Sequence, residues 1–213
     1  MMKVKKLLTL FSLLFFSTQI VAGMSDEISN IQHAWAVANY QTPESEQEQA
    51  FESLVAEGRK LAEANPDSAE PKVWLAIVLS TDAGVTGGFG ALGKVKEAHR
   101  LLEAAEKINP DALHGSIYTS LGSLYYQVPG WPIGFGDDEK AEQYLKKALS
   151  LNPAGIDPNY FYGDFMLEEG EYQQAVKYLE KAAAAPPRPA RPIADKGRQA
   201  EVQAKLQQAR KKL

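Results

Sequence analysis

Small and large apolar residues recur along this chain with the spacing of one helix face. Ala141, Leu145 and Ala148 lie four and three residues apart, and Pro153 follows them. Positions three and four apart lie on one side of a helix, so the pattern predicts a helix with one buried face, which the proline ends. The same residue types recur at Ala175, Leu179, Ala182 and Pro187, and at Ala98, Leu102, Ala105 and Pro110.

The recurrence resembles the tetratricopeptide repeat (TPR) family, whose unit is a pair of antiparallel helices of about 34 residues. Gly163 and Ala175 are small where the two helices of a unit approach each other, and Gly170 lies in the expected turn between them. Gly122 fills the same position in the preceding unit, and Asp137 or Asp138 is expected to cap its second helix. In the Trp74 unit, Val78 or Ala76 replaces the usual glycine.

About four units are expected, which makes the fold all-α. The first unit pairs Ile28–Tyr40 with Pro43–Asn65, and the prolines after the last unit precede a helix from Asp195 to about Lys211. We expect that helix to cap the open end of the stack and to bury Val202 and Leu206. A proline-rich ligand for a partner's aromatic groove is the alternative. The family resemblance implies a right-handed superhelix.

The N-terminus has the order of a secretory signal peptide, in which lysines precede a short apolar run and then a small, polar segment. Cleavage after Ala22 or Gly23 fits best. The predicted domains are therefore a signal peptide (1–23), a TPR-like repeat domain (24–187), and a proline-rich connection with a basic capping helix (188–213). The expected location is the periplasm.

Composition excludes several classes of function. The chain has no cysteine, which removes disulfides and thiolate metal sites, and its formal net charge of -4 disfavours nucleic-acid binding. Lys and Arg are concentrated from Arg188 onward, whereas the preceding body is acidic. The basic C-terminal helix either contacts acidic surfaces transiently or simply exposes solvated charges.

Catalytic and metal-binding motifs are missing from the sequence. His33, His99 and His114 belong to three different predicted units and form no paired metal motif. The glycine-rich run Gly88–Gly93 spells a dinucleotide fingerprint, but its flanks carry helical-repeat signatures instead of a strand and a helix. We therefore predict no enzyme, no cofactor and no metal.

Two glycine-rich insertions interrupt the repeat period, and we expect both to be loops within a unit. They are Thr81–Gly93 and Val128–Gly136, and each contains Gly-Phe-Gly. Phe89 and Phe135 either pack under their own loops or face a ligand. Trp131 is the candidate anchor for a partner, because a rigid loop aromatic loses little entropy on binding.

The TPR resemblance also implies a concave groove lined by the first helix of each unit. By position, the groove-facing candidates are polar or aromatic, namely Thr119, Ser123, Tyr126, Tyr160, Asp164 and Glu168. Such a lining suits a protein or peptide held by hydrogen bonds and aromatic contacts. The main hypothesis is thus a periplasmic protein–protein interaction scaffold; the partner and the oligomeric state stay open.

A second resemblance leads to an alternative function. The Trp74 unit, the glycine-rich insertions and the signal peptide are similar to the periplasmic T-component proteins of some TRAP transporters, over roughly residues 70–185. These are helical-repeat proteins that work beside a substrate-binding protein, and many carry a lipid on a cysteine that this chain does not have. This resemblance implies an accessory protein that binds a small hydrophobic or anionic molecule.

Overall fold

The computed structural model describes residues 24–213, so the predicted signal peptide lies outside the described residues. This part of the chain is helical and contains no β-strand. After a helical segment at residues 24–40, the helices are α2 (Glu44–Ala64), α3 (Ala69–Thr86), α4 (Gly88–Ile108), α5 (Ser116–Gln127), α6 (Asp138–Leu151), α7 (Ile156–Glu168), α8 (Tyr172–Ala183) and α9 (Pro192–Arg210). A 3₁₀ turn, Ala112–Gly115, precedes α5.

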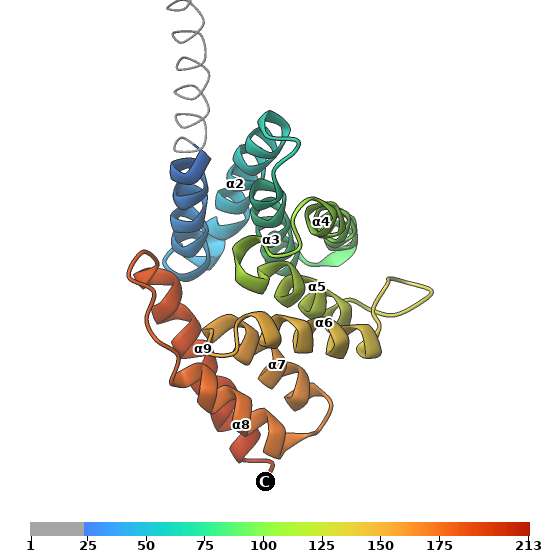
Figure 1. The fold of residues 1–213 in the computed structure, drawn as a ribbon, viewed down its shortest axis with the longest axis vertical. Coiled ribbons are helices and arrows are strands. Elements are labelled where there is room, and N and C mark those ends of the chain that lie inside the picture. Colours follow the sequence, from blue (N-terminus) through green and yellow to red (C-terminus); the bar gives the residue numbers. More distant parts are fainter. Residues whose placement is uncertain (1–23) are drawn as a thin grey trace, which may run out of the picture.

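Successive helices pack as hairpins that follow one another along a curved array (Figure 1). The helical segment at residues 24–40 packs with α2, α3 with α4, α5 with α6, and α7 with α8. These four units agree with the repeat pattern, including the first unit, whose sequence departs most from it. The all-α repeat fold predicted from the sequence is confirmed.

The residues that define the repeat form the seams between helices. The recurrent Ala, Leu and Ala of α4, α6 and α8 are fully buried. A Cβ added at Gly122 would lie 2.5 Å from Leu145 Cγ, and one added at Gly163 would lie 2.8 Å from Leu179 Cγ. Glycine therefore lets the first helix of each unit approach the leucine of the second. Gly170 has a φ of +77° in the turn between α7 and α8, as its predicted position requires.

The first insertion is not the predicted loop. Helix α3 continues to Thr86 and α4 begins at Gly88, so only Gly87, at φ +63°, separates them. The buried Asp82 carboxylate lies 2.7 Å from Lys94 Nζ and accepts a hydrogen bond from the Thr86 hydroxyl. The insertion therefore lengthens both helices, because these contacts join their ends across a single-residue turn.

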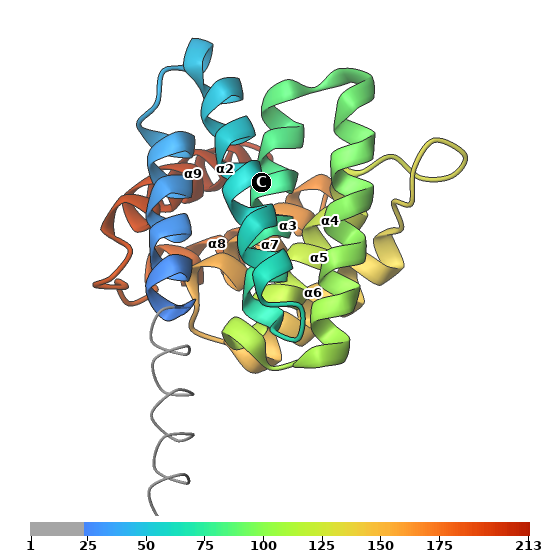
Figure 2. The same ribbon diagram turned by 90° about the horizontal axis from the view of Figure 1, so that it is seen from above.

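The second insertion is the loop that the sequence predicts. Residues 128–137 connect α5 to α6, and the Asp137 carboxylate caps α6 by accepting a hydrogen bond of 3.1 Å from the Lys140 backbone N–H. Within the loop, the Gly136 N–H donates to the Pro129 carbonyl oxygen. The loop extends away from the helices at the α5–α6 end of the unit (Figures 1 and 2).

Helix α9 packs against two different parts of the array, and the sequence predicted only one of them. Its later half packs on α7 and α8 and buries Val202 and Leu206, as expected for a capping helix. Its first half reaches the opposite end of the array, where Ala194 joins the core cluster of Ile28 and Trp35. Figures 1 and 2 both show α9 beside the N-terminal helical segment. The chain thus closes on itself, which a simple end cap would not do.

Close packing secures this contact between the two ends of the chain. Gly197 of α9 lies against the Tyr40 ring, and a Cβ at this position would overlap the ring atoms. The Arg191 guanidinium, just before α9, lies over the Trp74 ring with its carbon 5.0 Å from the ring centroid. Only glycine fits at position 197, because any side chain there would overlap the Tyr40 ring.

Candidate ligand cavity

A cavity of about 960 Å³ opens on the concave side of the array. Its walls come from the first helix of every unit, from the start of α2, and from the C-terminal segment that closes the array. They include Gln32, Trp35, Asn39, Gln47, Trp74, Ile77, Thr81, Val85, Leu113, His114, Ser116, Thr119, Ser120, Ser123, Gln127, Asp157, Phe161, Arg188, Arg191 and Arg198. This size lies within the range of small-molecule and short-peptide pockets.

One wall of the cavity is aromatic and apolar. The rings of Trp35 and Trp74 meet edge to face with their centroids 6.3 Å apart. Trp35 Nε1 donates a hydrogen bond of 2.9 Å to the Thr81 hydroxyl. Phe161 of α7 contributes a third ring on the side of the C-terminal segment. The wall therefore offers flat apolar surface to the body of a ligand.

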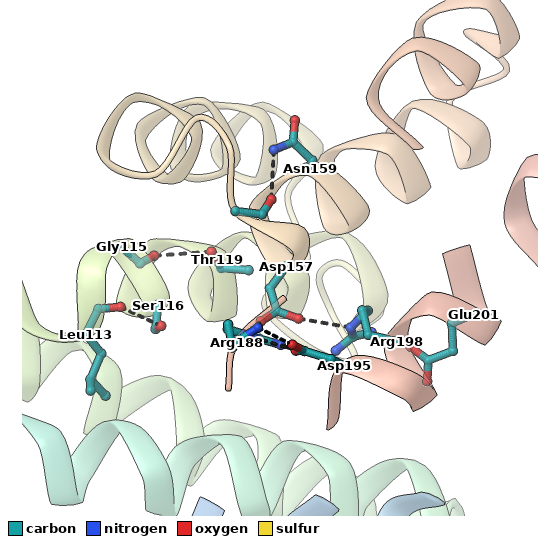
Figure 3. A network of polar contacts seen from close by, with 11 residues as sticks. Leu113, Gly115, Ser116, Thr119, Asp157, Asn159, Arg188, Asp195, Arg198 and Glu201 are labelled. Atoms are coloured by element: carbon teal, nitrogen blue, oxygen red, sulfur yellow. Dashed lines mark hydrogen bonds and ion pairs between the residues drawn. The ribbon is translucent and has the colours of Figure 1, made fainter. Parts of the chain in front are cut away.

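The wall formed by α5 is polar. Ser116, Thr119, Ser120 and Ser123 line the cavity from this helix. The Thr119 hydroxyl donates to the Gly115 carbonyl oxygen and the Ser116 hydroxyl to that of Leu113, at 3.2 and 2.7 Å (Figure 3). Both hydroxyl oxygens keep lone pairs that accept hydrogen bonds from a ligand.

The turn before α5 is strained where it meets the cavity. Leu113 and His114, which both line the cavity, have φ values of 53° and 51°. Residues with a side chain rarely adopt this left-handed region, and such conformations cluster at ligand-binding sites. The strain therefore lies in residues that line the cavity, as expected for a ligand-binding site.

An arginine and carboxylate network forms the floor near the C-terminal segment. Asp157 lies between two arginines, 2.6 Å from Arg188 Nη1 and 3.0 Å from Arg198 Nε, as Figure 3 shows. Arg188 also binds Asp195, and Arg198 binds Glu201. Burial alone would raise the pKa of Asp157, but Arg198 and Arg188 lower it to about 2. The network joins α7 to α9 and to the connection before it.

Arg191 differs from its two neighbours. It forms none of the ion pairs found among residues 24–213, and its buried Nε–H has no hydrogen-bond acceptor there. Burial and the positive charge of Arg188 lower the pKa of Arg191. The side chain stays charged at neutral pH, because the pKa of arginine lies so far above 7.

The six predicted groove residues separate into two groups. Thr119 and Ser123 line the cavity, whereas Tyr126, Tyr160, Asp164 and Glu168 do not. Tyr126 Oη donates to Asp164 at 2.9 Å, and Lys205 of α9 lies 2.6 Å from the same carboxylate and 3.9 Å from that of Glu168. The Arg198 guanidinium covers the Tyr160 ring.

Of the six candidates, only Thr119 and Ser123 thus line the cavity, while Glu168 is exposed outside it. Asp164 and Tyr160 are only 5% and 7% exposed, because α9 packs over this part of α7. The Asp164 carboxylate binds residues of α5 and α9, and the Tyr160 ring lies under Arg198 of α9, contacts which the repeat pattern of α7 alone does not reveal. Burial and the Asp164 charge raise the pKa of Tyr126 well above its usual value.

The three predicted loop residues also differ in their surroundings. Trp131, at 90% exposure, extends from the α5–α6 loop together with Ile133. Phe135 packs inward, with its ring centroid 4.6 Å from that of His99 and 5.7 Å from that of Tyr125. Phe89 lies in the first turn of α4, and its side chain lies outside what the structure describes.

Sequence reasoning missed the residues that distinguish the cavity. Trp35, Trp74 and Phe161 are aromatic residues of first helices, and Arg188, Arg191 and Arg198 belong to a tail that is predicted only as basic. The signal available in the sequence was the arginine at these three positions, since most other cationic residues of the C-terminal segment are lysines. Arginine is preferred over lysine where planar groups are paired or stacked.

Across residues 24–213, no cluster of His, Asp and Glu is arranged to hold a metal ion. None of the helices described is both long and apolar enough to cross a membrane.

Stacked helical hairpins around a concave cavity define a helical-repeat protein. Residues 133–210 match the family model described as tetratricopeptide repeat. The match covers the C-terminal units, and the fold over the described residues is a helical-repeat fold like that of tetratricopeptide repeat proteins. Proteins of this family generally act as non-catalytic scaffolds that bind other proteins.

One solved structure supports this fold, and two others match it less closely. The thermophilic TPR protein TTC0263 from Thermus thermophilus is 15% identical, with a TM-score of 0.58, over 87% of this chain and 98% of its own. MamA is 20% identical with a TM-score of 0.46, over 77% and 89% of the two chains. pilF from Pseudomonas aeruginosa is 21% identical with a TM-score of 0.35, over 87% and 93%. No curated protein matches the chain by sequence.

Proposed function

We propose that this protein is an exported, non-catalytic binding protein of the periplasm that holds a short segment of a partner protein in its concave cavity. The observation that carries the proposal is the cavity itself, to which the first helix of every repeat contributes. The signal-peptide pattern of residues 1–23 supports the location. The fold supports the binding role, since TPR proteins generally bind protein partners.

The lining of the cavity favours a short segment over a long one. Because α9 and the connection before it reach the N-terminal unit, the concave side is bounded where an open array would leave a continuous groove. The α5 hydroxyls supply polar contacts along one wall, and the Trp35 and Trp74 rings supply apolar contact along another. A bounded cavity of this size accommodates a few residues of a partner.

Site-specific cross-linking in intact cells tests this proposal. A photoreactive residue at Ser120 would lie in the cavity, and the same residue at Ser150, exposed on α6, serves as the matched control. We expect one protein to be cross-linked from Ser120 and not from Ser150. Equal products at the two positions, or none at Ser120, would contradict binding in the cavity. Cell fractionation with and without residues 1–23 tests export.

A small-molecule carrier is the second candidate, and the closed array favours it. If the protein works beside a transporter, as its resemblance to TRAP T-component proteins suggests, the bounded cavity would hold a small molecule instead of a peptide. Native mass spectrometry of the protein purified from the envelope distinguishes the two functions. A bound small molecule together with no Ser120 cross-link would replace the scaffold function with this one.

A further inference from the structure

Two buried hydrogen-bond donors meet at the aromatic wall of the cavity without acceptors. Trp74 is only 3% exposed and lines the cavity, and among the described residues no acceptor binds its Nε1–H. The Nε–H of Arg191 is likewise buried and unpaired within residues 24–213. The guanidinium carbon lies 5.0 Å from the Trp74 ring centroid. Buried polar groups are normally hydrogen-bonded. Two neighbouring N–H donors without acceptors therefore indicate a ligand that accepts hydrogen bonds from them.

The charges around these donors favour an anion. Arg188 and Arg198 are already paired with Asp157, Asp195 and Glu201. Arg191 has no carboxylate at ion-pair distance among the residues described, although it lies beside this network. Its planar guanidinium forms strong, directed hydrogen bonds with an anionic oxygen. The cation available to a ligand is therefore Arg191, held in place by its contact with Trp74.

The same charges limit the anion to a singly charged group. The three arginines face three carboxylates here, so the neighbourhood as a whole is balanced. A doubly charged phosphate would cost more to desolvate than a carboxylate, since that cost grows with the square of the charge, and the balanced neighbourhood has no net positive charge to offset it. The adjoining rings of Trp35 and Phe161 suit an apolar body attached to that carboxylate.

We propose that the cavity recognises a carboxylate on an apolar body, and that Arg191 and Trp74 Nε1 donate hydrogen bonds to it. The proposal rests on the cavity being the binding site and names the chemistry of its ligand. The carboxylate belongs either to the chain end of a bound partner segment or to a free organic acid. The experiment below separates these two sources.

Calorimetric titration with acid and amide pairs tests the proposal. The probes are octanoate against octanamide, and N-acetyl-Phe-Leu with a free carboxylate against its C-terminal amide. We expect at least one acid to bind about tenfold more tightly than its amide, as a charge-assisted contact requires. Preference for the dipeptide acid identifies a chain end, and preference for octanoate identifies a free organic acid. Equal binding of acid and amide in both pairs, or no binding of either acid, overturns the proposal.

Variants of the two donors locate the contact. Arg191→Gln should reduce the acid preference to less than about twofold, and Trp74→Phe should weaken acid binding about threefold or more while leaving amide binding unchanged. Arg210→Gln removes one positive charge on the exposed side of α9, where Arg210 pairs with Glu180, and is the matched control. Persistence of the full acid preference in Arg191→Gln refutes the assignment. If that variant does not fold, Arg191→Lys replaces it. Lysine keeps the charge without the Nε donor and should show a reduced preference for the acid over the amide.

Failure of this inference is distinguishable from failure of the proposed function. A cross-link from Ser120 without any acid preference would leave the binding cavity in place and reject the carboxylate. The converse result is that Arg191→Gln abolishes the acid preference while no protein is cross-linked at Ser120. This result would retain the carboxylate site and reject the protein partner.

Discussion

At the scale of single residues, two glycines explain how close the helices of a unit lie. Gly122 and Gly163 occupy the positions where the first helix meets the leucine of the second, and neither has room for a Cβ. The repeat pattern alone predicts this role, since small residues recur there at a constant place in the unit. In contrast, Arg191 and Trp74 are far apart in the sequence, and no local pattern relates them.

The first prediction concerns Gly122→Ala. A Cβ here would lie 2.5 Å from Leu145 Cγ and 3.2 Å from the Leu145 backbone nitrogen, so relief requires the two helices to move apart. We expect a loss of about 1–3 kcal/mol in the free energy of unfolding, reduced by up to about 1 kcal/mol of gained helix propensity. Urea denaturation measures it.

Gly93→Ala is the matched control for this substitution. Gly93 lies in α4, and nothing is within 4 Å of a Cβ built on it. Alanine should therefore stabilise the protein by up to about 1 kcal/mol through helix propensity alone. If both variants gained stability equally, close packing at Gly122 would be disproved.

The second prediction concerns the pH dependence that Asp157 confers. Its pKa is about 2 in the folded protein against an ordinary 3.8, so the folded state releases the proton more readily than the unfolded state. The resulting stability is fully present above about pH 4 and is lost as the pH falls towards about 2. Asp157→Asn should therefore be about 2 kcal/mol less stable than wild type at pH 7.

Unfolding free energies measured between pH 2 and pH 7 check this expectation. The difference between wild type and Asp157→Asn should shrink below about pH 4 and nearly vanish near pH 2. Asp138→Asn, at an exposed position in α6, controls for the loss of one negative charge. A difference that stays constant over the whole range would show that Asp157 acts through packing alone.

At the scale of elements, the α5–α6 loop combines two aromatic residues with opposite surroundings. Phe135 packs on His99 and Tyr125, whereas Trp131 is 90% exposed. The sequence places both in one glycine-rich loop and does not distinguish between them. Only the packing of the loop against α4 and α5 decides which ring is partly buried.

The third prediction compares alanine substitutions of Phe135 and Trp131. Phe135→Ala should lower the free energy of unfolding by roughly 2 kcal/mol, because it leaves a space beside His99 and Tyr125. Trp131→Ala should change it by no more than about 0.5 kcal/mol, as substitutions of exposed residues usually do. Thermal and urea denaturation of both variants measure these values. Equal losses would mean that Trp131 packs in solution.

The first insertion shows where element prediction failed. Its glycines indicated a loop from Thr81 to Gly93, but the segment forms the adjoining ends of α3 and α4. The contact of Asp82 with Lys94 and Thr86, made only after the helices pair, stabilises both ends. Local propensity could not reveal a contact that depends on the hairpin itself.

At the scale of the whole molecule, the repeat array closes because α9 reaches the first unit. Gly197 lies against Tyr40, and Ala194 and Ile193 join the cluster around Trp35. This closure gives the cavity its boundary and brings Arg191 to Trp74. The C-terminal segment thus has a structural role in the binding site as well as in capping the stack.

The fourth prediction is that Gly197→Val opens this closure. The valine side chain would overlap the Tyr40 ring, so the start of α9 must move away from residues 24–40. Because the chain has no cysteine, Glu48→Cys and Ala200→Cys provide unique sites for spin labels. Their distance distribution should shift to longer values and broaden.

Lys196→Val, at the exposed neighbouring position, is the control for a valine in α9. It should retain the distance distribution of the wild type, since its side chain does not face Tyr40. An unchanged distribution in Gly197→Val would show that the closed array tolerates a side chain at this contact.

The residue pattern alone is enough to predict the repeat units, the seams of Ala, Leu and Gly within them, the second loop and the capping role of Val202 and Leu206. These features depend on residues within one or two helical turns or on a repeated pattern, so periodicity reveals them. The folded chain was needed to show that the array closes, that α9 covers Tyr160 and Asp164, and that Arg191 meets Trp74. Those contacts depend on the accumulated curvature of four units, which brings distant segments together and leaves no periodic signal in the sequence.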